Sequence, residues 1–285
     1  MSISPQLGEE RLVAVPAGTI SYRERGTGSP IVFVHGVAVN GDLWRGVVPE
    51  LPDHRCITPD LPWGSHSVPL RPETDLSLPA MARIVADFLD VLDLTDVTIV
   101  ANDTGGAVAQ ALVGRHPDRI GRLVLTSCDA FEKFPPTPQK YLEVAARSRI
   151  LTWIVAYTAK FKAIQRLPTA YGYVTSRPMP ADIMRSFTGP IRMNPGVRRD
   201  FRRMLRAVDT KYTFEAAERL TTFDKPALVL WADGDKIFPR EHGQRLARLL
   251  PQGDFALIRQ SRTFIPEEQP ELLATAIEDF LARTE

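Results

Sequence analysis

Six short apolar runs, separated by segments of helical periodicity, constrain the fold of this chain more than any other feature. The runs are Ile31–Val34, Cys56–Thr58, Val97–Val100, Leu123–Leu125, Ala227–Trp231 and Phe255–Ile258. Near-continuous apolar runs are typical of strands buried on both faces of a parallel sheet. Helical patterns lie between several of them, at Pro79–Leu92, Gly105–His116, Arg240–Leu250 and Pro270–Ala282. The alternation predicts a doubly wound α/β sheet, preceded by a β-hairpin made of Arg11–Ala17 and Thr19–Arg23.

The alternation stops between about Glu132 and Glu215, where helix-like segments follow one another without a clear strand. We therefore expect a helical cap at 133–215, inserted into a core made of 1–132 and 216–285. The cap carries 16 Lys and Arg against 5 Asp and Glu, a net charge of +11, in a chain of net charge +1. A basic cap would attract anionic substrates or a phosphate-bearing carrier. Since charge runs more often form a solvated helix face, the solvated face is the favoured interpretation.

Composition narrows the classes of function. The 285 residues are 44 % hydrophobic, as in ordinary globular proteins, and the near-zero net charge gives no support for a nucleic-acid partner. No apolar run approaches the ~18 residues of a membrane span, and the start MSISPQLGEE lacks the features of a signal peptide. Cys56 and Cys128 lie in apolar runs and are expected to be reduced thiols. We expect a cytoplasmic protein without a membrane partner, and the oligomeric state stays open.

The segment Val97–Gly106, VTIVANDTGG, places one acidic side chain at the apex of a strand-to-helix turn. Small residues flank Asp103, and the following helix points its N-terminal amides at the apex. Asp is also a favoured helix N-cap, which is the structural alternative for Asp103. The segment resembles the nucleophile elbow of the α/β-hydrolase superfamily, with Asp103 where the G-x-S-x-G pattern has serine. Ala101 departs from that pattern, and Gly105 fits it.

The resemblance extends over nearly the whole chain. His35-Gly36 resembles the family's oxyanion loop, which implies that the amides of Val37 and Thr104 form the oxyanion hole. Asp60–Ser67 resembles the D-x-P-x-G-x-x-S loop beside the pocket. Leu230–Pro239 matches W-x-x-x-D-x-x-x-P, which implies Asp235 as the catalytic acid. The implied pocket residues are His35, Gly36, Trp63, His66, Asn102 and Phe264.

The family's histidine is missing from its expected position. Arg262–Pro270 resembles the segment G-H-F-x-x-x-E-x-P, and Thr263 stands at the histidine position. A threonine hydroxyl cannot act as a general base near neutral pH. The implied catalytic set is Asp103, Thr263 and Asp235. His66 is the best candidate for a substitute base, and Asp129, at the end of the expected strand Leu123–Cys128, is an alternative acid.

An aspartate at the apex narrows the resemblance to epoxide hydrolases and haloalkane dehalogenases, whose carboxylate forms an ester with the substrate. Dehalogenation is disfavoured because Thr104 and Val37 stand where that branch has halide donors. Epoxide opening draws protons from cap tyrosines, for which the candidates are Tyr141, Tyr157, Tyr171, Tyr173 and Tyr212.

We expect a hydrolase that acts on a small, largely apolar substrate, an epoxide or an ester rather than a haloalkane. One alternative is a lyase, isomerase or cyclase that uses Asp103 in acid–base chemistry with a raised pKa. Another is a ligand-binding protein without turnover. We expect no metal, because no cluster of His, Cys and carboxylates has ligand spacing. We expect no nucleotide cofactor, because no G-x-G-x-x-G follows a strand.

Overall fold

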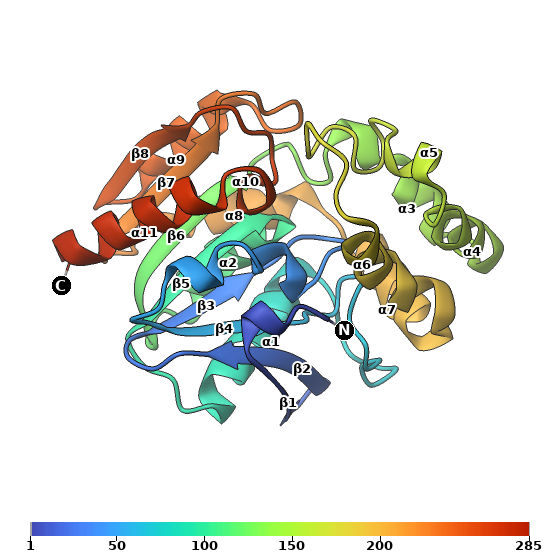
Figure 1. Ribbon diagram of the computed structural model, residues 1–285, viewed down its shortest axis with the longest axis horizontal. Coiled ribbons are helices and arrows are strands. Elements are labelled where there is room, and N and C mark those ends of the chain that lie inside the picture. The colour runs from blue at the N-terminus through green and yellow to red at the C-terminus, as the bar shows by residue number, and fades with distance from the viewer. Residues whose placement is uncertain (1, 285) are drawn as a thin grey trace.

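The computed structural model describes residues 2–284, and its centre is an eight-stranded sheet with helices packed against it (Figure 1). The strand order is β1-β2-β4-β3-β5-β6-β7-β8. Pairing is antiparallel for β1 with β2 and for β2 with β4, and parallel across the rest of the sheet. The strands are β1 Glu9–Val15, β2 Gly18–Arg25, β3 Pro30–Val34, β4 Arg55–Pro59, β5 Val97–Asp103, β6 Ile120–Cys128, β7 Ala227–Ala232 and β8 Gly253–Ile258. This confirms the predicted α/β-hydrolase fold, with its hairpin at one edge.

Burial explains why the apolar runs become strands. Strands β5, β6 and β7 lie inside the sheet and are almost entirely buried, whereas β8 at the edge alternates between exposed and covered residues. The helices of the core begin and end close to the predicted positions. They are α1 Leu78–Val91, α2 Thr104–Arg115, α9 Arg240–Leu249 and α11 Pro270–Thr284, and a short helix that was not predicted, α10 Ile265–Glu268, precedes α11. Helices α1 and α2 pack side by side, and α9 packs on β7 and β8.

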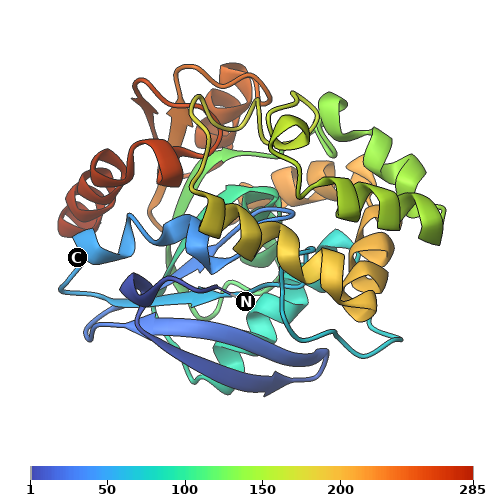
Figure 2. The same ribbon diagram turned by 45° about the vertical axis from the view of Figure 1, so that its right-hand side comes forward.

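Between β6 and β7 the described chain is helical. Its elements are η4 Thr137–Gln139, α3 Tyr141–Ala146, α4 Arg149–Thr158, α5 Lys162–Gln165, α6 Ala181–Met193, α7 Pro195–Arg206 and α8 Thr210–Leu220. Helices α3 to α7 stand together at one side of the sheet (Figure 2). Helix α8 packs against α2, and the Arg219 side chain covers Gly114. The expected cap boundary at 215 therefore falls inside a helix of the core layer, and we infer that the cap ends before α8.

Helix α7 carries the run of cap arginines on an amphipathic surface. Val197, Phe201 and Met204 are buried, while the arginines at 198, 199, 202, 203 and 206 are partly or fully exposed. Within the described residues, no helix is both long and apolar enough to cross a membrane.

Candidate active site

Asp103 stands at the sharp turn between β5 and α2. Its backbone has a φ of +55°, a left-handed conformation that is uncommon outside glycine. Two glycines allow the close packing around it. A Cβ at Gly36 would lie 2.1 Å from Asp103 Oδ2, and a Cβ at Gly105 would lie 2.3 Å from the carbonyl oxygen of Val34. The turn therefore holds the Asp103 carboxyl group against the loop that follows β3.

The Asp103 carboxyl group accepts hydrogen bonds from the backbone N–H groups of Val37 and Thr104. These are the two amides that the resemblance implies for the oxyanion hole. Burial of the carboxyl group, together with the nearby charge of Asp235, raises the pKa of Asp103 to about 7, although the two amides oppose the shift. A carboxyl group with this pKa is present in both protonation states at neutral pH.

Asp235, which follows β7, is fixed by three hydrogen bonds. Its Oδ1 accepts from the backbone N–H of Ile237 at 2.8 Å, from that of Phe238 at 2.9 Å and from Thr263 Oγ1 at 2.9 Å. Burial raises the pKa of Asp235 in spite of these donors. The Thr263 hydroxyl is thus next to the acid, where the family resemblance places a histidine. Asn102 Nδ2 donates to the Thr263 carbonyl oxygen at 2.8 Å and so ties this loop to the elbow strand.

Asp129 is hydrogen-bonded to helix α2. Thr104 Oγ1 donates to Asp129 Oδ2 at 2.7 Å, and Gln110 Nε2 donates to the Asp129 carbonyl oxygen at 2.9 Å. Burial, and then the charge of Asp103, raise the pKa of Asp129 well above its usual value. Asp129 therefore supports the start of α2, and Asp235 is the carboxylate that is bonded to residue 263.

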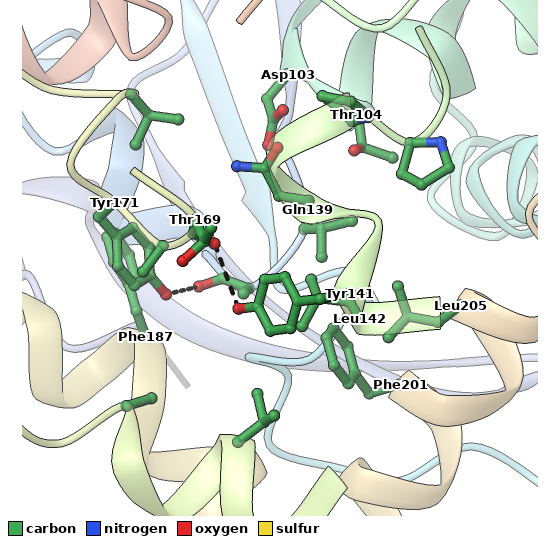
Figure 3. Close-up of a pocket in the computed structure, with 18 of the residues that line it drawn as sticks. Asp103, Thr104, Gln139, Tyr141, Leu142, Thr169, Tyr171, Phe187, Phe201 and Leu205 are labelled. Carbon is green, nitrogen blue, oxygen red and sulfur yellow. Dashed lines mark hydrogen bonds between the residues drawn. The ribbon is translucent and has the colours of Figure 1, made fainter. Parts of the chain in front are cut away.

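The cavity in front of Asp103 has a volume of about 270 Å³ and a largely apolar lining. Core and cap both contribute to it, and Figure 3 shows Asp103 and Thr104 on one side with Tyr171, Phe187, Phe201 and Leu205 around the rest. Val37 and Phe264 also line it, as the sequence leads us to expect. A largely apolar cavity next to a buried carboxyl group suits a small apolar substrate.

The other expected pocket residues do not line this cavity. His35 is buried below it, donates from Nδ1 to the Gly36 carbonyl oxygen and accepts from the Leu61 N–H at Nε2, each at 2.8 Å. Burial lowers the pKa of His35 to about 3, so the ring is neutral. His66 turns away because its Nε2 lies 3.3 Å from the buried Asp200 Oδ2 of α7. Gly36 packs against the Asp103 side chain, and Trp63 and Asn102 are fully buried.

None of the chain's five histidines, all of which the structure describes, lines the cavity. His54 pairs with Glu278 and His242 with Glu132, each at 3.1 Å, and His116 follows α2. The site therefore holds carboxyl and hydroxyl groups without an imidazole.

The cap contributes polar residues to the lining, among them Tyr171 and Gln139. Tyr171 Oη donates to the Ala38 carbonyl oxygen at 2.7 Å, and burial raises the pKa of Tyr171. Of the five cap tyrosines, Tyr141 and Tyr171 line the cavity (Figure 3). Gln139 also lines it, and its Oε1 is buried without a hydrogen-bond partner among the described residues. Sequence reasoning missed Gln139, because it lies in a proline-rich segment whose facing depends on the whole cap.

Comparison with known proteins identifies the family of the chain. The sequence model of the alpha/beta hydrolase fold family matches residues 29–270. A cis-3-alkyl-4-alkyloxetan-2-one decarboxylase from Xanthomonas campestris is 28% identical over 96% of this chain and 96% of its own length. A haloalkane dehalogenase from Mesorhizobium japonicum is 35% identical over 42% of this chain and 40% of its own. The crystal structure of the haloalkane dehalogenase DatA from Agrobacterium tumefaciens superimposes with a TM-score of 0.79 and 22% identity over 99% of both chains, which shows the common fold.

Proposed function

This chain belongs to the alpha/beta hydrolase fold family and is an enzyme of that family, and on this premise we propose that Asp103 attacks an electrophilic carbon of a small, largely apolar substrate. The observation that carries the proposal is the Asp103 carboxyl group at the elbow, facing an apolar cavity with no histidine in its lining. The amides of Val37 and Thr104 donate to the carboxylate and hold it at the elbow. A carboxylate removed from water is a stronger nucleophile than a solvated one.

The absent histidine decides among the substrate classes. Attack on an epoxide or an open-chain ester leaves a covalent ester or anhydride on Asp103, and water must then remove it. Activation of that water by a general base is typically worth ~10²–10⁴ in rate. Thr263 Oγ1 is engaged with Asp235 and has no proton-accepting state at neutral pH. A hydrolase with this site would therefore hydrolyse the covalent intermediate on Asp103 slowly.

A strained cyclic ester of the oxetan-2-one class avoids this step. Asp103 attacks ring carbon 4, whose bond to the ring oxygen breaks, and an alkyl ester forms next to a free carboxylate. Loss of CO₂ from that carboxylate sends the carbon–carbon bond electrons into a new alkene and expels the Asp103 carboxylate. The lactone becomes an alkene and CO₂, and neither water nor a proton is consumed. We therefore favour a 3,4-dialkyl oxetan-2-one as the substrate class, in keeping with the activity named for the Xanthomonas relative.

The test is a product analysis with a cis-3,4-dialkyl oxetan-2-one, alongside an epoxide and an activated ester. We expect alkene and CO₂ by gas chromatography and mass spectrometry, and loss of both products in Asp103→Asn and Asp103→Ala. Full activity in Asp103→Ala would overturn the role of Asp103. Binding of all three compounds without any product, with Asp103→Asn altering only affinity, would identify a ligand-binding protein instead.

Replacement of Thr263 tests the missing base directly. With Thr263→His, we expect the covalent ester of Asp103 to be hydrolysed as well, so that β-hydroxy acid appears beside the alkene from the lactone. The epoxide, which stalls as an ester on the native enzyme, should turn over at least about 10²-fold faster. Thr263→Ser keeps a hydroxyl group next to Asp235 and should yield alkene alone. An unchanged ratio of products in Thr263→His would count against a stalled ester.

A second function is favoured by the pKa of Asp103, which at about 7 suits proton transfer by a lyase, isomerase or cyclase. The two functions differ in covalent chemistry. Rapid quenching during turnover, followed by intact-mass measurement, detects an adduct on Asp103 if the carboxylate is the nucleophile and none if it only moves a proton.

A further inference from the structure

The cap carries an exposed apolar surface that neither the core nor the active-site cavity uses. Its members, which we call the α4 face, lie on α4 and the turn after it and are between 40% and 71% exposed. They are Ile150, Leu151, Trp153, Ile154, Tyr157 and Phe161. Trp153 stacks on Tyr157, with 5.2 Å between the ring centroids. Apolar patches of this kind on a folded protein mark binding surfaces.

Helix α4 is apolar on two sides. Val155, Ala156 and Ala159, on its inner side and just beyond its end, line the cavity in front of Asp103. The α4 face is on the outer side, and Figures 1 and 2 show α4 at the rim of the cap, far from the sheet. A helix with apolar residues all around its surface is normally covered on every side. The outer side is therefore expected to have a partner.

Positive charge lies beside the α4 face. Lys160 Nζ lies 3.7 Å from the centroid of the Tyr157 ring and 5.0 Å from that of Phe161. Phe161 also lines a second cavity of about 780 Å³, which has no Asp or Glu in its lining. Its six cationic residues are Lys160, Lys162, Arg166, Arg177, Arg185 and Arg192. None of the six forms a salt bridge with another described residue.

The charges distinguish between two possible occupants. In a symmetric dimer the same surface of each copy meets the other, so the cationic rims would come together and repel. An anionic lipid surface complements both parts, because apolar side chains enter the boundary between headgroups and acyl chains while Lys and Arg contact phosphates. We propose that the α4 face docks on the surface of an anionic lipid bilayer. Such docking needs no membrane-spanning segment. It departs from the sequence-based expectation of no membrane partner, because hydropathy along the sequence does not detect a surface patch of this kind.

Docking in this way places the cavity in front of Asp103 directly behind the helix that meets the bilayer. Docking therefore brings the cavity close to apolar substrates dissolved in the membrane. The proposal rests on the surface of the cap, and it holds whether or not an oxetan-2-one is the substrate.

The chain offers a built-in probe of docking. It has four tryptophans, of which Trp44, Trp63 and Trp231 are fully buried, whereas Trp153 on the α4 face is 47% exposed. We expect vesicles of phosphatidylcholine mixed equally with phosphatidylglycerol to shift the tryptophan emission to the blue and to protect it from acrylamide. Pure phosphatidylcholine vesicles should have little effect, and added salt should reverse the shift. The protein should float with the anionic vesicles in a density gradient.

Variants separate docking from other outcomes. The double variant Lys160→Glu/Lys162→Glu should weaken binding to anionic vesicles at least about tenfold, and Ile150→Glu should weaken it as well. Arg248→Glu on α9 and Leu12→Glu on β1 change exposed residues of the core and should bind like the parent. Absence of any blue shift, or equal losses in the control variants, would overturn the proposal. So would a concentration-dependent dimer, seen by sedimentation without lipid, that buries Trp153.

Discussion

At the scale of single residues, the protonation of Asp103 controls when the proposed nucleophile is active. Its pKa is raised to about 7, so the carboxylate is lost as the pH falls through 7 and is fully present above it. We expect kcat/KM for a lactone to rise with pH, to reach half its maximum near pH 7 and then to level off. A pH–rate profile between about pH 5 and 9 measures this. Activity that falls as the pH rises would indicate that the protonated carboxyl group reacts.

The same profile tests the cause of the shift. Asp235→Asn removes the neighbouring charge, which is the second contribution after burial, so the midpoint of the profile should move to lower pH. Asp254→Asn removes an exposed carboxylate on β8 and should leave the midpoint where it is. Equal midpoints in the parent and in Asp235→Asn would show that burial alone sets the pKa.

Individual site residues differ in how well the sequence predicts them. The order and spacing of the family motifs predict Asp103, Asp235 and Thr263 as site residues. In the structure, Thr263 Oγ1 donates to Asp235 Oδ1 at 2.9 Å. The orientation of His66 was not predictable, because it is set by Asp200, which lies 134 residues later in the cap. The size of the pKa shift at Asp103 was not predictable either, since it depends on how completely the cap and core exclude water from the carboxyl group.

At the scale of elements, the elbow depends on glycines at the start of α2. Gly105→Ala would place a Cβ 2.3 Å from the Val34 carbonyl oxygen and 2.5 Å from that of His35, so backbone must move. We expect lower stability by urea denaturation and a loss of activity. In Gly189→Ala, on α6, the new Cβ would meet only Met193 Cε at 3.5 Å, which is ordinary contact. That variant should be neutral or more stable by up to about 1 kcal/mol, and equal effects of the two substitutions would contradict this account.

Apolar runs predict strand centres better than strand ends. Strand β6 continues beyond the apolar run Leu123–Leu125 through Thr126 and Ser127, which are buried polar residues. Their hydroxyl groups are satisfied across the sheet, because Thr126 Oγ1 donates to the Ala101 carbonyl oxygen at 3.0 Å and Ser127 Oγ accepts from the Ala232 N–H at 3.0 Å. A hydropathy pattern ends the apolar run at such polar residues. Their hydrogen bonds to the neighbouring strands show that they belong to the strand.

At the scale of the whole molecule, the cavity exists because the cap is held on the core. The sequence predicts an insertion of helices, but it does not show which side chains join the two parts. Asp200 of α7 is fully buried and accepts from the Leu70 N–H at 2.8 Å, while His66 Nε2 lies 3.3 Å from the same oxygen. Burial alone would raise the pKa of Asp200, but the hydrogen bonds from His66, Leu70 and Arg199 outweigh it and lower the pKa. The charged carboxylate therefore ties α7 to the loop that precedes α1.

Removal of this carboxylate should loosen the cap. In Asp200→Ala, the Leu70 N–H, the His66 ring and the Arg199 guanidinium lose their acceptor inside the protein. This loss costs about 3 kcal/mol or more of folding free energy. We expect faster amide hydrogen exchange at 65–70 and 195–206, and a lower kcat/KM because Phe201, Met204 and Leu205 of α7 line the cavity. Asp182→Ala changes an exposed acid in the first turn of α6 and should leave both measurements unchanged. If exchange in Asp200→Ala rises evenly over the whole sheet instead, Asp200 stabilises the fold in general and the cap is not a separately anchored part.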